Sequence, residues 1–306
     1  MDVRGKRPLP GEALTSEPTT PATVLYIAFL CLLWGGNIVA MKIGLRGVPP
    51  VGAAGFRFLL ASLSVLLFAA IRRAPLGVRR DLWPHLFALG ALFVLQHAAF
   101  NLGLNLTSAS RSVVFMYTQP VFTVLLAHLL IPGERLSAAR VGGVFVCMVG
   151  LIAVFAERLE GGAPSMLLGD GLVTLAAVAW ALQSVYMKRL LSRADPFVLT
   201  LYQMAIAFPC FFLINRLAEP TLVYLVDAGI VLAFLYQGSL VGGLTFVAWT
   251  VLIRRHQVSQ ISAFIFLTPI FGVLLSWLFL GDPITRGLVI GVLLVAAGIA
   301  LVNRTE

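Results

Sequence analysis

The side chains of this chain that can do chemistry are few, and they stand inside long apolar runs. His97 lies in the run 83–104, where an imidazole that changes charge near neutral pH can contact a solute or relay a proton. A neutral His97 that hydrogen-bonds to a neighbouring helix is the alternative, and both interpretations stay open. Asn101 follows one helical turn later and shares the face of His97.

Two polar and two aromatic residues recur at equivalent places in the two halves of the chain. Asn37 and Gln183 form one such pair, and we expect them either to hydrogen-bond unwound backbone or to have a purely structural role. Trp34 and Trp180 lie one turn before them. A deep tryptophan is usually part of a core, because interfacial tryptophans lie at span ends. A flat ring also suits an apolar or aromatic solute, and Trp180 is the preferred pocket wall.

Proline marks the fourth and ninth apolar runs at equivalent positions. Tyr117 and Gln119 precede Pro120, and Thr268 precedes Pro269. Proline lacks a backbone donor and frees carbonyls one turn back, which only a polar lining tolerates within a membrane. The candidate solute-binding residues are therefore His97, Trp180, Asn37, Tyr117, Gln119, Asn101, Gln183, Trp34 and Tyr236, and the candidate gating hinges are Pro120 and Pro269.

Arg57 stands inside the second apolar run, seven residues after Pro50 and roughly 10 Å from its start. Its guanidinium either extends to the interface or holds a solute carboxylate, and the sequence favours the first interpretation. No Asp or Glu lies well inside a run, so the usual carboxylate carrier of protons or sodium is missing. Coupling through His97 and uncoupled exchange both stay open.

Enzyme and metal chemistry are not predicted. The chain has no HExxH and no GxSxG, and its four histidines are spread too widely for a metal cluster. We therefore expect no enzymatic activity, no metal and no cofactor. A channel is a further rival, but the sequence offers neither a selectivity loop nor a ring of charge.

The composition places the protein in lipid. Hydrophobic residues make up 59% of the 306 and charged residues only 11%, with a mean hydropathy of +0.97, whereas a soluble domain is about 25% charged. The formal net charge of +9 does not indicate nucleic-acid binding, because the basic residues stand mostly in short loops between apolar runs. The expected partners are the bilayer and a small-molecule solute.

The apolar runs predict an all-α membrane protein with ten transmembrane helices, since a spanning helix needs roughly twenty apolar residues. The excess of Lys and Arg in alternate connections predicts cytoplasmic N- and C-termini, and the polar, proline-rich residues 1–22 predict a disordered tail. The runs cover residues 23–43, 50–71, 83–104, 108–131, 139–156, 168–190, 196–216, 228–252, 259–281 and 286–303.

The two halves repeat one pattern. Trp34-Gly35-Gly36-Asn37 corresponds to Trp180-Ala181-Leu182-Gln183, and Pro120-Val121-Phe122 corresponds to Pro269-Ile270-Phe271. A unit of five spans is odd, so the second half enters the membrane inverted, which is the architecture of alternating-access transporters. The repeats are predicted as 23–160 and 165–303. Glycines at heptad spacing predict close helix packing and are compatible with a homodimer contact: Gly143, Gly150, Gly291 and Gly298.

At these residues the chain resembles the EamA family of the drug/metabolite transporter superfamily. The resemblance is carried by Trp34-Gly35-Gly36-Asn37, Arg57-Phe58-Leu59-Leu60-Ala61 and Gln119-Pro120-Val121-Phe122 through Gly133-Glu134-Arg135-Leu136, with Gly281-Asp282-Pro283 as a departure in the second copy. It implies ten helices, two inverted repeats, and export or exchange of small metabolites such as amino acids. A bacterial inner-membrane location and a preference for apolar or aromatic amino acids follow as expectations, and another metabolite class is the alternative.

Overall fold

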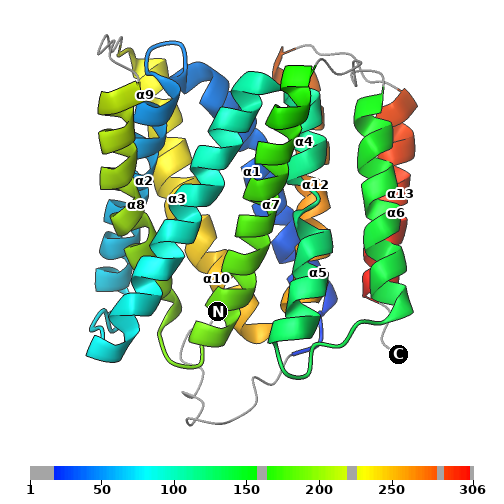
Figure 1. The fold of residues 1–306 in the computed structure, drawn as a ribbon, viewed down its shortest axis with the longest axis horizontal. Coiled ribbons are helices and arrows are strands. Elements are labelled where there is room, and N and C mark those ends of the chain that lie inside the picture. The colour runs from blue at the N-terminus through cyan, green and yellow to red at the C-terminus, as the bar shows by residue number, and fades with distance from the viewer. Residues whose placement is uncertain (1–16, 157–163, 219–225, 281–285, 304–306) are drawn as a thin grey trace.

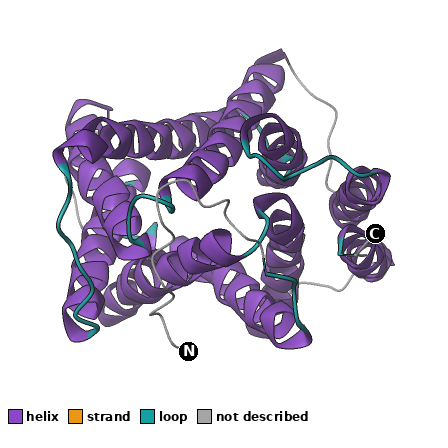
Figure 2. Cartoon of the chain, turned by 90° about the horizontal axis from the view of Figure 1, so that it is seen from below, coloured by secondary structure: helices purple, strands orange, loops and turns teal. Residues whose placement is uncertain are grey.

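The computed structural model describes residues 17–156, 164–218, 226–280 and 286–303, and all regular secondary structure in these ranges is helical (Figure 2). The first half contains α1 (Pro21–Gly44), α2 (Pro50–Ile71), η1 (Arg80–Leu82), α3 (Trp83–Leu106), α4 (Ala109–Met116), α5 (Gln119–Leu130) and α6 (Ala138–Phe155). The second half contains α7 (Pro164–Leu190), α8 (Pro196–Ala218), α9 (Ala228–Leu235), η3 (Tyr236–Thr245), α10 (Phe246–Arg255), α11 (Val258–Ser262), η4 (Ala263–Phe266), α12 (Leu267–Leu280) and α13 (Arg286–Val302).

These elements form ten spans. Nine stretches of the described chain are long and apolar enough to cross a membrane, and α13 is a shorter apolar helix. The fourth span joins α4 and α5, the eighth joins α9, η3 and α10, and the ninth joins α11, η4 and α12. The all-α, ten-helix prediction is confirmed. Of the predicted tail 1–22, residues 1–16 lie outside the described ranges, and Glu17 N donates to Arg255 O at 2.8 Å.

Proline and short polar side chains determine where the helices begin. Proline stands in the first turn of α1, α2, α3 and α5. The N–H groups of a first turn have no acceptor within the helix, so a proline there costs no helical hydrogen bond. Elsewhere a side chain accepts the free amide: Ser108 from Arg111 N, and Asp227 from Ile230 N. These caps allow the chain to enter each span without leaving the first amides unpaired in lipid.

The close helix pairs join one half of the chain to the other. α2 packs on α8 and η3, α3 on α7, α1 on α12, and α6 on α13. Two of these pairs join equivalent spans of the two halves: the second span packs on the seventh, and the fifth packs on the tenth. The described chain begins and ends at the same end of the molecule, where Thr19 Oγ1 donates to Asn303 Oδ1 at 2.9 Å, and α6 with α13 stand together at one side of it (Figure 1). We call the end where the described chain begins and ends the termini end and the opposite end the open end.

The heptad glycines bring α6 and α13 into backbone contact. A Cβ on Gly143 would stand 2.6 Å from Gly298 O, and one on Gly298 would stand 2.5 Å from Gly143 O. Gly150 and Gly291 meet in the same way, at 2.9 and 2.6 Å. The prediction of close packing is confirmed, and this glycine face is covered within the chain itself.

Both proline-marked spans are interrupted where the sequence predicts. α4 ends at Met116 and α5 begins at Gln119, with Thr118 Oγ1 donating to Phe115 O at 2.6 Å. In the ninth span the 3-10 turn η4 leads into α12, which contains Pro269. The sequence did not predict the π-helix η3, a rare form that is frequent at functional sites.

We expect Gly143→Ala to destabilise the protein by about 1–3 kcal/mol, because the added methyl group would force α6 away from the backbone of α13. Gly142→Ala is the matched control: its Cβ would meet only Leu301 Cδ2 at 3.7 Å, so the change should be neutral or stabilise by up to about 1 kcal/mol. Thermal unfolding of the two purified variants measures the difference. Equal stabilities would contradict the described α6–α13 contact.

Candidate functional site

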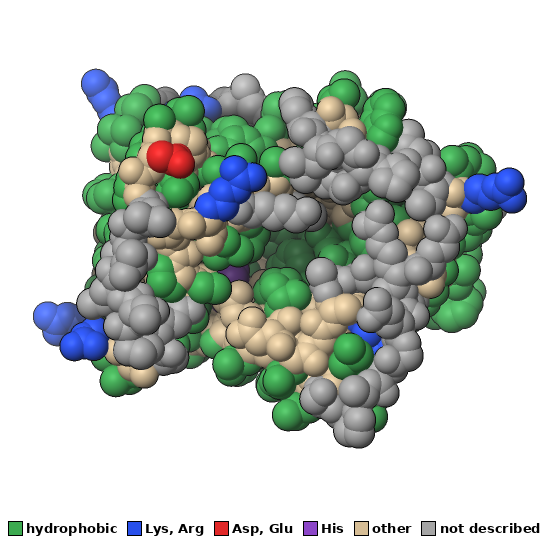
Figure 3. All heavy atoms as spheres, turned by 90° about the horizontal axis from the view of Figure 1, so that it is seen from above, with side chains coloured by type: hydrophobic (Ala, Val, Ile, Leu, Met, Phe, Trp, Pro, Cys, Tyr) green, Lys and Arg blue, Asp and Glu red, His purple; other side chains and the backbone are tan. Residues whose placement is uncertain are grey.

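A hollow opens between the helices at the open end, and a histidine side chain lies within it (Figure 3). His97 belongs to the half of α3 nearest this end, whereas His85 begins α3, His128 lies in the last turn of α5 and His256 follows α10. Of the four histidines, His97 is thus the one that lies toward the open end.

His97 is held in one orientation by its own helix and by phenylalanine rings. Nδ1 lies 2.9 Å from Phe93 O, and the imidazole packs against the rings of Phe93 and Phe58 at centroid distances of 4.3 and 4.8 Å. A carbonyl oxygen only accepts, so Nδ1 carries the hydrogen and Nε2 of the neutral ring is free to accept. Asn101, one turn further along α3, is partly exposed.

Two of the predicted residues fasten the π-helix η3 to α1. Trp34 Nε1 donates to Thr245 Oγ1 at 2.7 Å, and the Tyr236 hydroxyl donates to Leu33 O at 2.8 Å. Gln237 Nε2 adds a bond to Ala40 O at 3.0 Å. The indole N–H of Trp34 and the hydroxyl of Tyr236 thus bond within the protein, and no sequence pattern predicts the role of Thr245 as a partner.

Gln183 makes a contact between two helices. It lies in the uninterrupted helix α7, and its Nε2 donates to Gln203 Oε1 at 2.7 Å. Of the two alternatives for Gln183, this contact fits the structural role and not the bond to unwound backbone, because a neighbouring helix supplies a side-chain acceptor. Its repeat mate Asn37 lies in the uninterrupted helix α1, and its Oδ1 has no hydrogen-bond partner.

Five buried polar atoms of the described residues have no hydrogen-bond partner, and all five lie inside spans. Buried polar atoms in proteins are normally paired, so each such atom needs an explanation. Within a membrane the usual explanation is a water-filled or solute-filled cavity. The atoms are Asn37 Oδ1, Arg57 Nε, Gln96 Oε1, Gln119 Oε1 and Thr268 Oγ1.

The two helix interruptions bring the halves together near the proline residues. Tyr117 caps α4 and lies beside Thr268 of the second half and Cys31 of α1. Gln119, fully buried, donates to Thr123 Oγ1 at 2.8 Å and leaves its own oxygen unpaired. Trp180 is partly buried and packs against the central core.

At the termini end, a buried carboxylate closes the break between α10 and α11. Glu134, only 4% exposed, accepts from Val258 N at 2.8 Å, from Ser259 N at 3.0 Å and from Ser259 Oγ at 2.5 Å. The free amides at a helix N-terminus carry partial positive charge, so a carboxylate there forms strong charge-assisted bonds. Glu134 thus ties the first half of the chain to the second.

A buried lysine completes the same junction. Lys188, 1% exposed, donates through Nζ to His256 O at 2.7 Å and to Arg254 O at 3.1 Å. These carbonyls end α10, where the helix dipole favours a cation. We call Glu134, Lys188 and Ser259 the termini-end lock.

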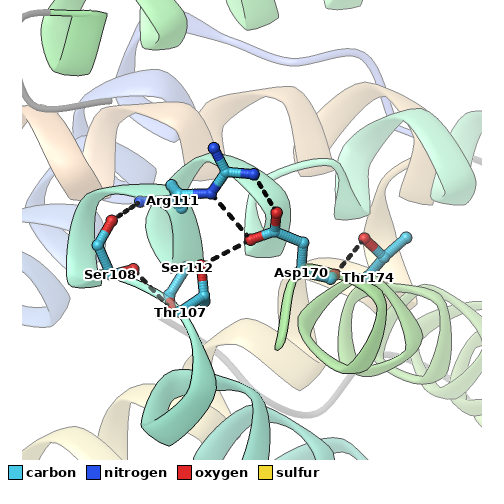
Figure 4. Close-up of polar contacts among 6 residues, drawn as sticks. All are labelled: Thr107, Ser108, Arg111, Ser112, Asp170 and Thr174. Carbon is cyan, nitrogen blue, oxygen red and sulfur yellow. Dashed lines mark hydrogen bonds and ion pairs between the residues drawn. The ribbon is translucent and has the colours of Figure 1, made fainter. Parts of the chain in front are cut away.

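At the open end an ion pair joins the break between α3 and α4 to the second half (Figure 4). Arg111 of α4 pairs with Asp170 of α7, with Arg111 Nε lying 3.3 Å from Oδ1. Thr107 Oγ1 donates to the same Oδ1 at 2.8 Å. The sequence predicts Glu134 and Asp170 at span ends but does not predict that they are buried. For Glu134 the one sequence signal is that Gly133-Glu134 recurs in the second half as Gly281-Asp282. This second copy lies outside the described residues.

The EamA-like transporter family model matches this chain twice, over residues 21–156 and 167–304. The chain belongs to the EamA-like transporter family. Each match coincides with one of the two five-span halves, so the family assignment and the repeat agree. As an EamA-like protein the chain is a multi-pass membrane transporter and not an enzyme.

Curated relatives of this EamA-like transporter cover almost its whole length. The uncharacterized transporter YoaV of Bacillus subtilis is 25% identical over 90% of this chain and 94% of its own. A probable amino-acid metabolite efflux pump of Escherichia coli is 25% identical over 88% of this chain and 90% of its own. A crystal structure that shares 23% identity superimposes with a TM-score of 0.82 over 92% of this chain and 98% of the other, which supports the fold.

Glu134→Gln should destabilise the transporter by about 1–3 kcal/mol, because an amide cannot accept three bonds with the strength of a buried carboxylate. The matched control is Asp227→Asn, which also caps a helix N-terminus but is exposed; Asn caps about as well as Asp. Thermal unfolding of both variants tests this. A Glu134→Gln protein as stable as the parent would mean that the termini-end lock contributes nothing to the described conformation.

Proposed function

We propose that this EamA-like transporter exports or exchanges small amino acids, with apolar and aromatic ones preferred, across the bacterial inner membrane by alternating access. The hollow at the open end carries the proposal: it lies between two inverted halves whose spans contain unpaired polar atoms beside aromatic rings. A zwitterion with an apolar side chain needs both kinds of contact. The named efflux pumps among the relatives support the same solute class.

The conformation described here is proposed to be the outward-open one. The termini are taken as cytoplasmic, so the open end faces the outside and the termini-end lock keeps the inside closed. Release or capture of solute on the inside then requires Glu134 and Lys188 to leave the break between α10 and α11. The interruptions before Pro120 and Pro269 are the proposed hinges, because a span that is already broken bends there without losing further hydrogen bonds.

The solute-binding roles divide between direct contact and support. His97 Nε2, Asn37 Oδ1 and Gln119 Oε1 are proposed as polar contacts, because each retains acceptor capacity. Trp180 and Tyr117 are proposed as the walls against which the solute side chain packs. The remaining candidates hold these residues in place or border them: Asn101, Gln183, Trp34 and Tyr236.

The substrate range and the domain boundaries complete the proposal. The halves 23–160 and 165–303 act as the two inverted repeats, each contributing one helix interruption to the site. Exchange without a coupling ion fits the absence of a carboxylate in the middle of the described spans. Another class of small metabolite is the second candidate, since most relatives are named only as uncharacterized transporters.

Purified protein in liposomes preloaded with amino acids should show saturable counterflow of labelled phenylalanine. We expect His97→Ala and Trp180→Ala each to lower its initial rate about tenfold or more, because each removes a proposed contact worth about 1.4 kcal/mol. The controls are His128→Ala, which lies at the termini end, and Trp277→Ala, whose side chain is 46% exposed on α12; both should retain the parental rate.

Two results would contradict parts of this proposal separately. Folded protein that shows no counterflow with any amino acid would refute the solute class. Counterflow that survives both His97→Ala and Trp180→Ala would retain the carrier and remove these residues from its site.

A further inference from the structure

Arg57 lies about two turns inside α2 from its open-end start, within an apolar span. Its guanidinium carbon stands 4.8 Å from the centre of the Phe58 ring. The same ring packs edge-on against His97. Arg57 and the proposed solute-contacting histidine therefore both contact the ring of Phe58.

The guanidinium of Arg57 has no counter-charge among the described residues. It makes no ion pair with a described acid, and its buried Nε has no hydrogen-bond partner. Two other cations that are at least partly buried have partners: Arg111 pairs with Asp170, and Lys188 bonds to two carbonyls. Among the described residues, Arg111 and Lys188 thus have partners near span ends, whereas Arg57 inside its span has no acid as a partner.

A cation without a partner inside a membrane is costly, and such residues commonly mark the path of a solute or ion. The face of Phe58 offsets part of this cost, since a cation–π contact contributes about 0.5–2 kcal/mol. An anion that enters the hollow would offset more, and the planar guanidinium fork matches a carboxylate in particular. The geometry therefore calls for an anionic group brought in from outside the protein.

We propose that Arg57 binds the carboxylate of the transported solute, and that His97 Nε2 accepts a hydrogen bond from the solute's ammonium group. The inference rests on the proposed function and names the chemical feature by which the site recognises its substrate. A carboxylate is preferred to a phosphate, because Arg57 is a single cation and a dianion would bring one uncompensated charge into the aromatic surroundings of Phe58, Phe93 and Phe211.

The experiment compares an acid with two analogues that lack its negative charge. Phenylalanine, phenylalaninamide and 2-phenylethylamine are tested as competitors of amino-acid counterflow and as stabilisers in thermal unfolding of the purified protein. In the parent, phenylalanine should bind at least about tenfold more tightly than either analogue. In Arg57→Gln its affinity should fall to that of the amine, while the affinities of the amide and the amine stay unchanged.

The matched control is Arg72→Gln at the other end of the same helix. Arg72 also stands over a phenylalanine, Phe68, at 5.5 Å, but it is exposed at the termini end, so the preference for the acid should persist. Arg57→Lys retains the charge and loses the fork, and it serves where Arg57→Gln does not fold. We expect it to bind phenylalanine several-fold more weakly than the parent.

The outcomes separate this inference from the function on which it rests. Equal affinity of the parent for acid and amine, or an unchanged affinity for phenylalanine in Arg57→Gln, would overturn the inference and leave amino-acid transport standing; Arg57 would then serve the scaffold or a lipid phosphate. A parent that carries no amino acid, yet is stabilised by phenylalanine and other monocarboxylates through Arg57, would overturn the transport proposal and retain the carboxylate site.

Discussion

Lipid offers no hydrogen bonds, and this constraint explains most of what the structure does with its polar groups. Near the ends of the bundle, where one helix follows another, three buried charged groups have partners: Glu134 accepts from amides of α11, Lys188 donates to carbonyls of α10, and Asp170 pairs with Arg111. Inside the spans, the side-chain oxygens of Asn37 and Gln119 have no hydrogen-bond partner. This contrast supports the proposal that a polar solute binds inside the spans.

The inverted repeat relates the two ends of the molecule to each other and suggests how they could exchange conformations during transport. Each half supplies one span interrupted just before a proline and one junction between consecutive helices, α3 with α4 in the first half and α10 with α11 in the second. In the described conformation the second junction is locked by Glu134 and Lys188 from elements outside it. Because the halves are related by sequence and inverted in the membrane, rearrangement of one junction toward the geometry of the other would close one end and open the other.

The sequence predicted what depends on hydrophobicity and on repetition, and it missed what depends on contacts between distant segments. The lengths of the apolar runs predicted the ten spans, and the glycines at heptad spacing predicted the close packing seen between α6 and α13. The prolines gave both interruptions. No local sequence pattern predicts that Gln183 bonds to Gln203 or that Glu134 is buried against α11, because in each case the partner belongs to another span. The π-helix η3 was missed for the same reason: its glycines are explained only by α2, since a Cβ on Gly238 would stand 2.5 Å from Leu60 Cβ.

A reversible cross-link across the termini-end lock tests most directly whether one site is opened to each side in turn. Cysteines replace Glu134 and Ser259 in a background without Cys31, Cys147 and Cys210, and a short bifunctional methanethiosulfonate joins them. The account predicts that the cross-linked protein still binds solute from the open end, that its counterflow falls to background, and that reduction restores it. Undiminished counterflow through the cross-linked protein would show that the termini end does not open during transport, and it would contradict the account.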